Sequence, residues 1–386
     1  MSTRVYLDHN ATSPLRPEAA EALRELLSSP PGNPSSLHAE GRSARARIEK
    51  ARAQVAGLTG WAPSEVVFTS GGSESIAAAV HGVTVRAGPT RRRIVVSAVE
   101  HSAVLESARE AHRAGFELSV VPCDARGWVN PDSFAHRLGD DVALAVLQWA
   151  NPETGVIQPI DAVVAACANA AIPLLVDAVQ AAGKLAMNRI VRRPDLLAIS
   201  AHKLGGPQGT GALMVRAGLS MAPLVPGGAQ EKRRRGGTEA VPAVVGFGAA
   251  AEAALRRVDS EAVRLGALRD RVEAFLRERF PGVHIHGAGV ERVANTLNFA
   301  VPGALGELLV IALDLAGFAL STGSACASGA VEPSHVLRAM GFTEDDARGA
   351  VRLSLGWSTT SAEIDRFLAV LPPIVERAQS ANSALS

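Results

Sequence analysis

The sequence contains few cysteines and no long apolar segment. Three cysteines occur among 386 residues, and an odd number in so long a chain argues against a disulfide framework and for a reducing compartment. The first residues, MSTRVYLDHN, carry charge and lack the apolar core of a signal peptide. No apolar run is long enough to span a bilayer. We therefore expect a cytoplasmic protein that does not contact a membrane.

An excess of charge of one sign is also missing. The chain has 39 basic and 38 acidic side chains, which gives a net charge of +1. Because no overall field favours nucleic acid, we expect small molecules or proteins as partners and no direct nucleic-acid binding. We expect three charged segments to face solvent, apart from Arg235, which is discussed below. They are RRR (91–93), EKRRR (231–235) and GRSARARIEKAR (41–52).

Short apolar segments alternate with alanine-rich segments of helical periodicity, such as 74–86 and 102–115. The apolar segments are predicted strands, namely EVVFTS (65–70), RIVVSAV (93–99), ELSVVP (117–122), ALAVLQW (143–149), IPLLVDAV (172–179), DLLAIS (195–200) and GALMV (211–215). This alternation predicts an α/β fold with a mostly parallel sheet that helices cover on both faces. Ligands of such a fold bind at the carboxyl ends of the strands.

The pattern changes near residue 240. A long helix, a strand at TLNFAV (296–301) and a closing helix near the C-terminus predict a second, smaller α+β domain that the N-terminal residues complete. We expect a large domain over residues 15–256 and a small domain formed by residues 1–14 and 257–386.

Three predicted strand ends carry residues that can bind a ligand or take part in a reaction. The segment GGSES (71–75) is a glycine turn before a helix, where free backbone N–H groups can bind an anion such as phosphate. Asp177 ends an apolar strand, and a buried carboxylate there needs a cationic partner such as a protonated pyridine nitrogen. Lys203 follows another strand, and a lysine amine of lowered pKa can condense with an aldehyde. Each feature alone is commonly structural, but together they fit pyridoxal 5′-phosphate.

The chain resembles the cysteine desulfurases, the NifS/IscS-like branch of the class V aminotransferase superfamily. The matching motifs run nearly end to end and are YLDHNATSP (6–14), GNPSSLH (32–38), VFTSGGSES (67–75), EHSAV (100–104), ETGVIQP (153–159), VDAVQAAGK (176–184), SAHKLGGPQGTGAL (200–213), GGAQE (227–231), RGGTEAVP (235–242), STGSACASG (321–329), EPSHVLRAMG (332–341) and VRLSLGWSTT (351–360). The resemblance implies the fold of the pyridoxal-phosphate-dependent transferases, which is like that of aspartate aminotransferase. It also implies removal of sulfur from L-cysteine, giving L-alanine and an enzyme persulfide.

The resemblance further implies roles in holding the cofactor. Lys203 would hold it covalently, Asp177 would pair with its pyridine nitrogen and Gln180 would reach its phenolic oxygen. His101 would stack on the ring and move protons. The residues implied to bind the phosphate are Gly72, Ser73, Ser200, His202 and, from the second subunit of a homodimer, Thr238, with Arg235 as its positional support.

For the substrate, the resemblance implies that Arg352 clamps the carboxylate with help from Asn33. Two departures from the family pattern stand nearby. Pro152 replaces an asparagine that contacts the cofactor in relatives, so we expect Asn151 to take over that contact. Trp357 stands where relatives often have a basic residue. No metal site is expected.

Cys326 lies in STGSACASG (321–329), among small residues and between two glycines. Such a loop suits a thiolate that attacks the sulfur of the substrate and then carries it outward as a persulfide to an acceptor protein. Cys326 is therefore the expected nucleophile, carried by the small domain. Cys123 and Cys167 are expected to be structural.

Other functions remain open. A selenocysteine lyase or another class V aminotransferase-like enzyme would keep Lys203 and Asp177 without requiring Cys326 for ordinary turnover, and a scaffold without activity would not need Lys203. The sulfur could enter iron–sulfur assembly, tRNA thiolation, DNA phosphorothioation or cofactor synthesis, and the sequence does not distinguish these routes.

Overall fold

The computed structural model describes residues 4–322 and 333–385. Seven strands form the larger sheet, in the order β2-β8-β7-β6-β5-β3-β4. Their bounds are Val66–Thr69 (β2), Arg93–Ser97 (β3), Glu117–Val121 (β4), Val142–Gln148 (β5), Leu174–Asp177 (β6), Leu196–Ser200 (β7) and Gly211–Val215 (β8). Neighbouring strands are parallel except β8, which is antiparallel to both β2 and β7. The predicted mostly parallel sheet is confirmed.

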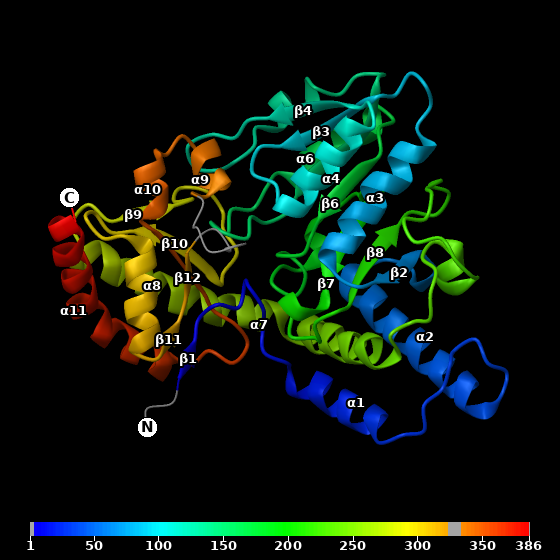
Figure 1. Ribbon diagram of the computed structural model, residues 1–386, viewed down its shortest axis with the longest axis horizontal. Helices are drawn as coiled ribbons and strands as arrows, with labels where there is room; N and C mark the ends of the chain where they lie inside the picture. Colours follow the sequence, from blue (N-terminus) through cyan, green and yellow to red (C-terminus); the bar gives the residue numbers. More distant parts are fainter. Residues whose placement is uncertain (1–3, 323–332, 386) are drawn as a thin grey trace.

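Helices cover both faces of this sheet (Figure 1). Leu144 and Val146 of β5 pack into one core with α3 (Gly72–Arg86) and α4 (Ser102–Arg113). Ala145 and Leu147 of the same strand face the opposite core, with α2 (Ala39–Thr59) and α6 (Ile160–Asn169). Because both faces are buried, the central strands β5, β6 and β7 are nearly uninterrupted apolar runs, whereas the edge strand β4 exposes Glu117 and Val120. The shorter helices near this unit are α1 (Pro17–Leu27) and α5 (Pro131–Ala135).

A second unit is built on four antiparallel strands in the order β12-β13-β10-β9. Their bounds are His284–His286 (β9), Thr296–Ala300 (β10), Ser321–Thr322 (β12) and Ala350–Ser354 (β13). Near the N-terminus, β1 (Val5–Tyr6) pairs in parallel with β11 (Phe318–Ala319), so the first residues lie with this unit. Its helices are α8 (Gly306–Leu315), α9 (His335–Ala339), α10 (Glu344–Arg348) and α11 (Ser361–Leu385).

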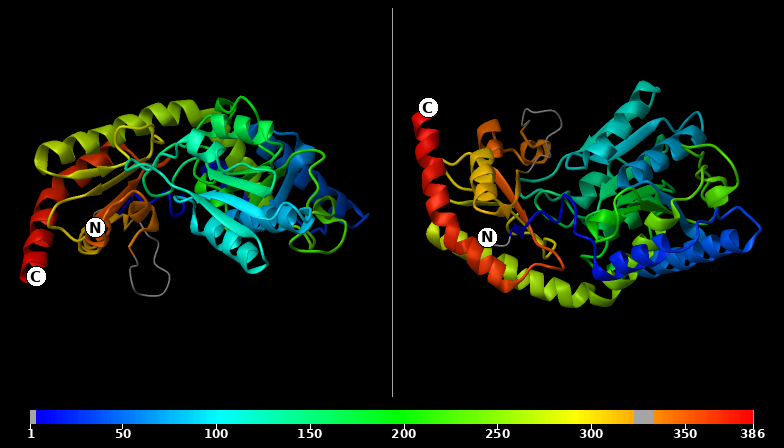
Figure 2. Two further views of the ribbon diagram at one scale, coloured as in Figure 1. Left: turned by 90° about the horizontal axis from the view of Figure 1, so that it is seen from above. Right: turned by 60° about the horizontal axis from the view of Figure 1, so that its bottom comes forward.

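One long helix, α7 (Val241–Arg279), runs along both units (Figure 2). Val244 and Phe247 near its start belong to the core of the larger sheet, whereas Val272 and Leu276 belong to the core of the second unit. The helix therefore sets how the two units sit against each other. The domain boundaries given above fall partly within it and stay a prediction. Among the described residues, no helix combines the length and apolarity that a membrane crossing requires.

Two charged residues differ from the expectation that their segments face solvent. Arg52 and Glu231 are both buried, and two N–O distances of 2.7 Å join their side chains. Glu231 also accepts a hydrogen bond from the backbone N–H of Phe68 at 2.9 Å. The expectation was wrong for these residues because a bidentate arginine–carboxylate pair satisfies both charges away from water. The pair fastens the loop that follows Glu231 to β2.

Candidate active site

The N-terminus of α3 and the end of β7 meet at one edge of the larger sheet. A Cβ atom built on Gly72 would lie 2.8 Å from Cγ2 of Val179 and 3.5 Å from Cβ of Ser200, so glycine is required for this close approach. The Oγ of Ser200 is buried and has no hydrogen-bond partner in the described part of the chain. Gly72 and Ser73 open α3, where backbone N–H groups lack helical partners. An unused hydroxyl beside a helix N-terminus suits a phosphate group.

Lys203 follows β7 directly, at the end of a short 3-10 turn. Its Nζ donates hydrogen bonds to the backbone oxygens of Asn10 at 2.7 Å and Ala11 at 2.8 Å. Burial lowers the pKa of the Lys203 amine to about 8, and the positive charge of Arg352 adds to this effect. A substantial fraction of the amine is therefore neutral near physiological pH, as a nucleophile requires.

Asp177 ends β6 and is 5% exposed. Its Oδ1 accepts a hydrogen bond from the backbone N–H of Val179 at 2.9 Å, and burial raises the pKa of the carboxyl group. No ion pair holds Asp177 among residues 4–322 and 333–385. A buried carboxyl without a paired cation fits a protonated ring nitrogen as its partner.

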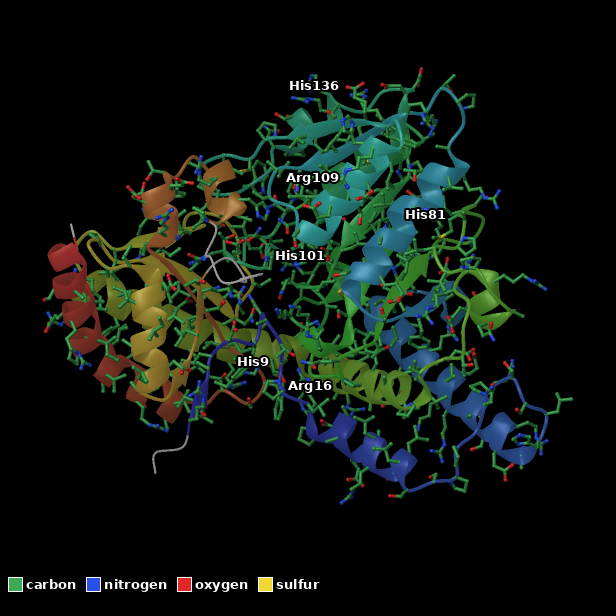
Figure 3. The ribbon with its side chains drawn as sticks, viewed as in Figure 1. His9, Arg16, His81, His101, Arg109 and His136 are labelled. Atoms are coloured by element: carbon green, nitrogen blue, oxygen red, sulfur yellow. The ribbon has the colours of Figure 1, made fainter. Side chains whose placement is uncertain are left out.

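His101 caps the N-terminus of α4, where its Nδ1 accepts a hydrogen bond from the backbone N–H of Ala103 at 3.1 Å. This bond leaves the hydrogen of the neutral ring on Nε2. The side chain is exposed and lies at the junction between the two units (Figure 3). Its ring is thus held at one end, with a face accessible from the junction.

Two buried glutamates lie beside these residues, and sequence patterns did not single them out. The Oε1 of Glu100 accepts hydrogen bonds from Oγ of Ser97 at 2.6 Å and from the backbone N–H of Gln148 at 3.0 Å. Burial raises the pKa of Glu100 to about 8, because its effect is larger than that of these two hydrogen bonds, which lower the pKa. Burial also raises the pKa of Glu153 to about 7, opposed by a hydrogen bond from Ser334 and by the charge of Arg352. Glu100 is therefore mostly protonated at neutral pH.

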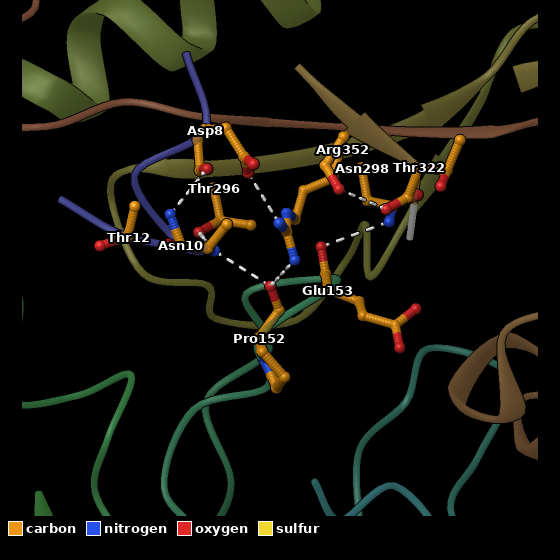
Figure 4. Close-up of polar contacts among 12 residues, drawn as sticks. Asp8, Asn10, Thr12, Pro152, Glu153, Thr296, Asn298, Thr322 and Arg352 are labelled. Atoms are coloured by element: carbon orange, nitrogen blue, oxygen red, sulfur yellow. Dashed lines mark hydrogen bonds and ion pairs between the residues drawn. The ribbon is translucent and has the colours of Figure 1, made fainter. Parts of the chain in front are cut away.

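Arg352, on β13, lies at the junction and is 5% exposed. Its Nη2 forms an ion pair with Oδ1 of Asp8 at 2.7 Å, and its Nη1 donates to the backbone oxygen of Pro152 at 3.3 Å (Figure 4). The Nε has no partner among the described residues. Asp8, which sequence patterns did not single out, thus fixes the guanidinium. The unused Nε and the weakly bound Nη1 remain to receive a carboxylate.

Asn10 connects more site residues than any sequence pattern indicated. Its backbone oxygen accepts hydrogen bonds from Lys203 and, at 3.0 Å, from Nε2 of Gln180. Its side-chain Oδ1 accepts from Nζ of Lys184 at 2.8 Å, and its Nδ2 donates to the backbone oxygen of Pro152 at 3.0 Å. The only available signal was that Asn10 and Lys184 lie within motifs shared with the family.

Two residues expected to contact the cofactor make hydrogen bonds within the chain. The Nδ2 of Asn151 donates to the backbone oxygen of Val99 at 3.1 Å, and its Oδ1 accepts from the backbone N–H groups of Glu153 and Thr154 at 2.9 Å each. Asn151 therefore holds a turn, and this geometry adds no support for a cofactor contact. His202 contacts Oγ1 of Thr12 at 3.2 Å, and burial lowers its pKa to about 4, so its ring is neutral.

Two expected residues do not meet the others within one chain. Asn33 is exposed in the loop between α1 and α2, which lies at the outer end of these helices, away from β10 and β12 (Figure 1). Its Oδ1 accepts a hydrogen bond from the backbone N–H of Ser35 at 2.9 Å. Thr238 is also exposed. Arg235, in the same loop, pairs with Glu74 of its own α3 at 2.9 Å.

The three cysteines have different positions. Cys167 is buried in α6, and burial raises the pKa of its thiol to about 12. Cys123 is half-buried after β4, and burial raises the pKa of its thiol to about 11. Both thiols stay protonated and are poor nucleophiles. Cys326 lies outside the described residues.

The residues at the sheet edge fit pyridoxal 5′-phosphate, because an unused Ser200 hydroxyl, a buried Asp177 and an amine of lowered pKa match its phosphate, ring nitrogen and aldehyde. The Trp357 side chain, the other departure from the family pattern, donates from Nε1 to the backbone oxygen of Pro14 at 3.0 Å. It therefore ties the segment after β13 to the N-terminal segment.

The chain is similar to known proteins over nearly its whole length. Residues 5–367 match the aminotransferase class-V family. A cysteine desulfurase of Cereibacter sphaeroides is 45% identical over 97% of this chain and 96% of its own. The cysteine desulfurase IscS of Dictyoglomus turgidum is 41% identical over 98% of this chain and 96% of its own. A solved NifS-like protein, 33% identical, superposes with a TM-score of 0.91 over 97% of this chain and 100% of that chain. The chain therefore belongs to the aminotransferase class-V family.

Proposed function

We propose that the protein is a cysteine desulfurase that removes sulfur from L-cysteine, releases L-alanine and passes the sulfur to an acceptor protein. The observation that carries this proposal is the Lys203 amine, whose pKa of about 8 suits covalent attachment of an aldehyde beside a buried Asp177. The cysteine desulfurases among its relatives, similar over nearly their full length, support the same activity.

Pyridoxal 5′-phosphate would supply an electron sink for the carbanion that forms at Cα of the substrate. Lys203 would hold its aldehyde carbon, Asp177 its ring nitrogen, and Gly72, Ser73 and Ser200 its phosphate. His202, being neutral, would assist as a hydrogen-bond partner. Gln180 would donate to the phenolic oxygen.

The substrate would be held and activated by the chain's own groups. Arg352, oriented by Asp8, would bind the carboxylate of cysteine. The neutral Nζ of Lys203 would accept the proton from Cα. His101, with its Nε2 hydrogen, would move protons near the thiol. The Cys326 thiolate would form a bond to the substrate sulfur as the Cβ–S bond breaks, and the bonding pair would stay with the alanine fragment and take up a proton.

A homodimer and a cytoplasmic location complete the proposal. Thr238 and Asn33 are exposed in one chain, so a second subunit could bring them to a site. The odd cysteine count suits a reducing compartment. The acceptor could serve iron–sulfur assembly or thiolation of tRNA. Sedimentation of the cofactor-loaded protein at micromolar concentration should give a dimer, and a fully loaded monomer would refute the shared site.

The activity is tested with purified protein, L-cysteine and a reductant. We expect equal amounts of sulfide and L-alanine from the wild type. Cys326→Ser should keep the cofactor and its visible absorbance but release no sulfide, because serine cannot take up the sulfur atom. Cys123→Ser is the matched control, since the Cys123 thiol is protonated and half-buried, and it should turn over normally.

The lyase alternative makes the opposite prediction. If Cys326→Ser released sulfide or selenide as fast as the wild type, the persulfide mechanism would be excluded in favour of a lyase. If the wild type itself formed no alanine from cysteine, the desulfurase proposal would be wrong.

A further inference from the structure

Lys184 is an unusual residue in this chain. Of the 39 basic side chains, only four are lysines, Lys50, Lys184, Lys203 and Lys232, and two of these meet at the candidate site. Lys184 is partly buried and has no carboxylate partner within ion-pair distance in the part of the chain that the structure describes. Its Nζ instead donates to two side-chain amides, at Oδ1 of Asn10 (2.8 Å) and at Oε1 of Gln180.

Burial, together with the positive charges of Lys203 and Arg352, lowers the pKa of the Lys184 amine well below its usual value. Protonated or neutral, the amine carries at least two N–H groups, enough to donate to both amide oxygens. A side-chain amide has an accepting oxygen and a donating NH2 group at nearly the same positions, so its orientation depends on its neighbours. The contact with Lys184 selects the oxygen end of Gln180. The NH2 end must then point the other way, where Nε2 gives one hydrogen to the backbone oxygen of Asn10 at 3.0 Å.

The same reasoning applies to Asn10. With Oδ1 held by Lys184 and by Nδ2 of Asn295 at 3.1 Å, the Nδ2 of Asn10 donates to the backbone oxygen of Pro152 and to Oγ1 of Thr296. Lys184 and the backbone oxygens of Asn10 and Pro152 thus select the same orientation of the two amides, with Lys184 holding the oxygen end of each. An arginine at this position would present a planar fork of five donors, more than two amide oxygens can receive, whereas a lysine offers a compact amine.

We propose that Lys184 is a positioning residue that holds the Gln180 amide with its NH2 group turned toward the cofactor. The inference rests on the proposed function, in which the phenolic oxygen of pyridoxal 5′-phosphate receives the second hydrogen of Nε2. Without Lys184, only the hydrogen bond to the Asn10 backbone oxygen holds the amide, so rotated orientations that present Oε1 to the phenolic oxygen become more populated. Two acceptors would then face each other, and the cofactor would bind more weakly.

A double-mutant cycle on the apoprotein tests this role. The dissociation constant of pyridoxal 5′-phosphate is measured for the wild type, Lys184→Met, Gln180→Ala and the double variant. We expect Lys184→Met to weaken binding about ten-fold, which corresponds to about 1.4 kcal/mol. The double variant should bind no more than about two-fold more weakly than Gln180→Ala, since Lys184 acts through Gln180. The proposal would be overturned if the two substitutions weakened binding independently, so that their fold-changes in dissociation constant multiplied in the double variant. It would also be overturned if Lys184→Met bound pyridoxal 5′-phosphate as tightly as the wild type.

A spectroscopic readout separates positioning from a general loss of packing. Loss of a donor to the phenolic oxygen favours the protonated form of the bound chromophore, so the pH midpoint of the visible absorbance should rise in Lys184→Met. Lys232→Met is the matched control, because Lys232 is exposed and its Nζ donates a hydrogen bond to the backbone oxygen of Ser64 at 2.9 Å, outside the candidate site. It should leave both the affinity and the midpoint unchanged.

Gln180→Glu keeps the test decisive if Lys184→Met does not fold. A carboxylate preserves the contact with Lys184 but has no N–H to donate, so cofactor binding should fall as in Gln180→Ala. Wild-type affinity in Gln180→Glu would show that the donor end is not used and would overturn the proposal. Failure of the wild-type apoprotein to bind pyridoxal 5′-phosphate would instead refute the proposed function.

Discussion

The candidate site has two halves of different origin. The sheet-edge half, with Ser200, Lys203 and Asp177, comes from the ends of neighbouring strands of one sheet. The junction half joins segments far apart in the chain: Asp8 contacts Arg352 across 344 positions, and Asn10 contacts Asn295 across 285. In the proposed function, the first half would hold the cofactor, and the second would orient the substrate and the side chains around it. Reactive groups can be located by local pattern, whereas orientation depends on how the two units close on each other.

Replacement of Lys203 breaks the sheet-edge half and should have the largest effect. Lys203→Ala removes the amine that would hold the cofactor and accept the Cα proton, so turnover should fall by about 10²–10⁴-fold or more. Borohydride should fix the cofactor on the wild-type peptide that contains Lys203 and on no peptide of the variant. Because the chain has only four lysines, peptide mapping identifies the attachment site directly. A label on Lys184 in the wild type would reverse the assignment of these two lysines.

Replacement of Arg352 breaks the junction half while leaving the sheet edge intact. Arg352→Lys keeps the charge beside Asp8 but loses the planar geometry that binds a carboxylate through two hydrogen bonds. We expect KM for L-cysteine to rise about 10–100-fold, with kcat changed less and the cofactor spectrum unchanged. Kinetics at saturating and limiting cysteine measure this difference. A variant that lost the cofactor would show instead that the two halves are not separable.

Sequence patterns drew attention to the sheet-edge half for a physical reason. Strands buried on both faces are nearly continuously apolar, so a polar residue at the end of such a strand is conspicuous, as at Asp177. Seven strand positions were confirmed on the same basis. Position thus drew attention to Asp177 and Lys203, whereas Ser200 and the role of each residue came from the family resemblance.

The junction half could not be predicted in this way. The pairing of Asp8 with Arg352 depends on the chain's closure around α7 and leaves no periodic signal. The prediction that charged segments face solvent was also wrong where a tertiary contact buries the charges, as in the pair of Arg52 and Glu231. Lys184 was inside a recognised motif, but the motif assigned no task to it. Partners that meet only in the folded chain have to be read from the structure.

The smallest expected effect is on the pH dependence of stability, and it concerns the two buried glutamates, one in each half. Glu100 lies at the sheet edge without an ion pair among the described residues, and burial, with the nearby Asp177 carboxyl group, raises its pKa to about 8. Glu153 lies at the junction, where Arg352 opposes the effect of burial and its pKa reaches only about 7. A carboxyl group whose pKa is higher in the folded than in the unfolded state lowers stability as pH rises through this interval. The loss begins near the ordinary value of 4.5 and is complete above about 8 for Glu100 and about 7 for Glu153.

Glutamine stays neutral and keeps the accepting oxygen, so each substitution should remove this loss. We expect Glu100→Gln to stabilise the apoprotein at pH 8 by on the order of 2 kcal/mol and Glu153→Gln by less, with little change near pH 4.5. Thermal unfolding at pH 5 and pH 8 measures both. The gain in stability must grow with pH. Above pH 4.5 the glutamate ionises readily in the unfolded wild type but not in the folded wild type, and the glutamine variant has no such difference. Equal gains at the two pH values would mean that the effect is packing and not charge. A larger gain from Glu153→Gln would mean that Arg352 is fully occupied by Asp8 and leaves Glu153 unopposed.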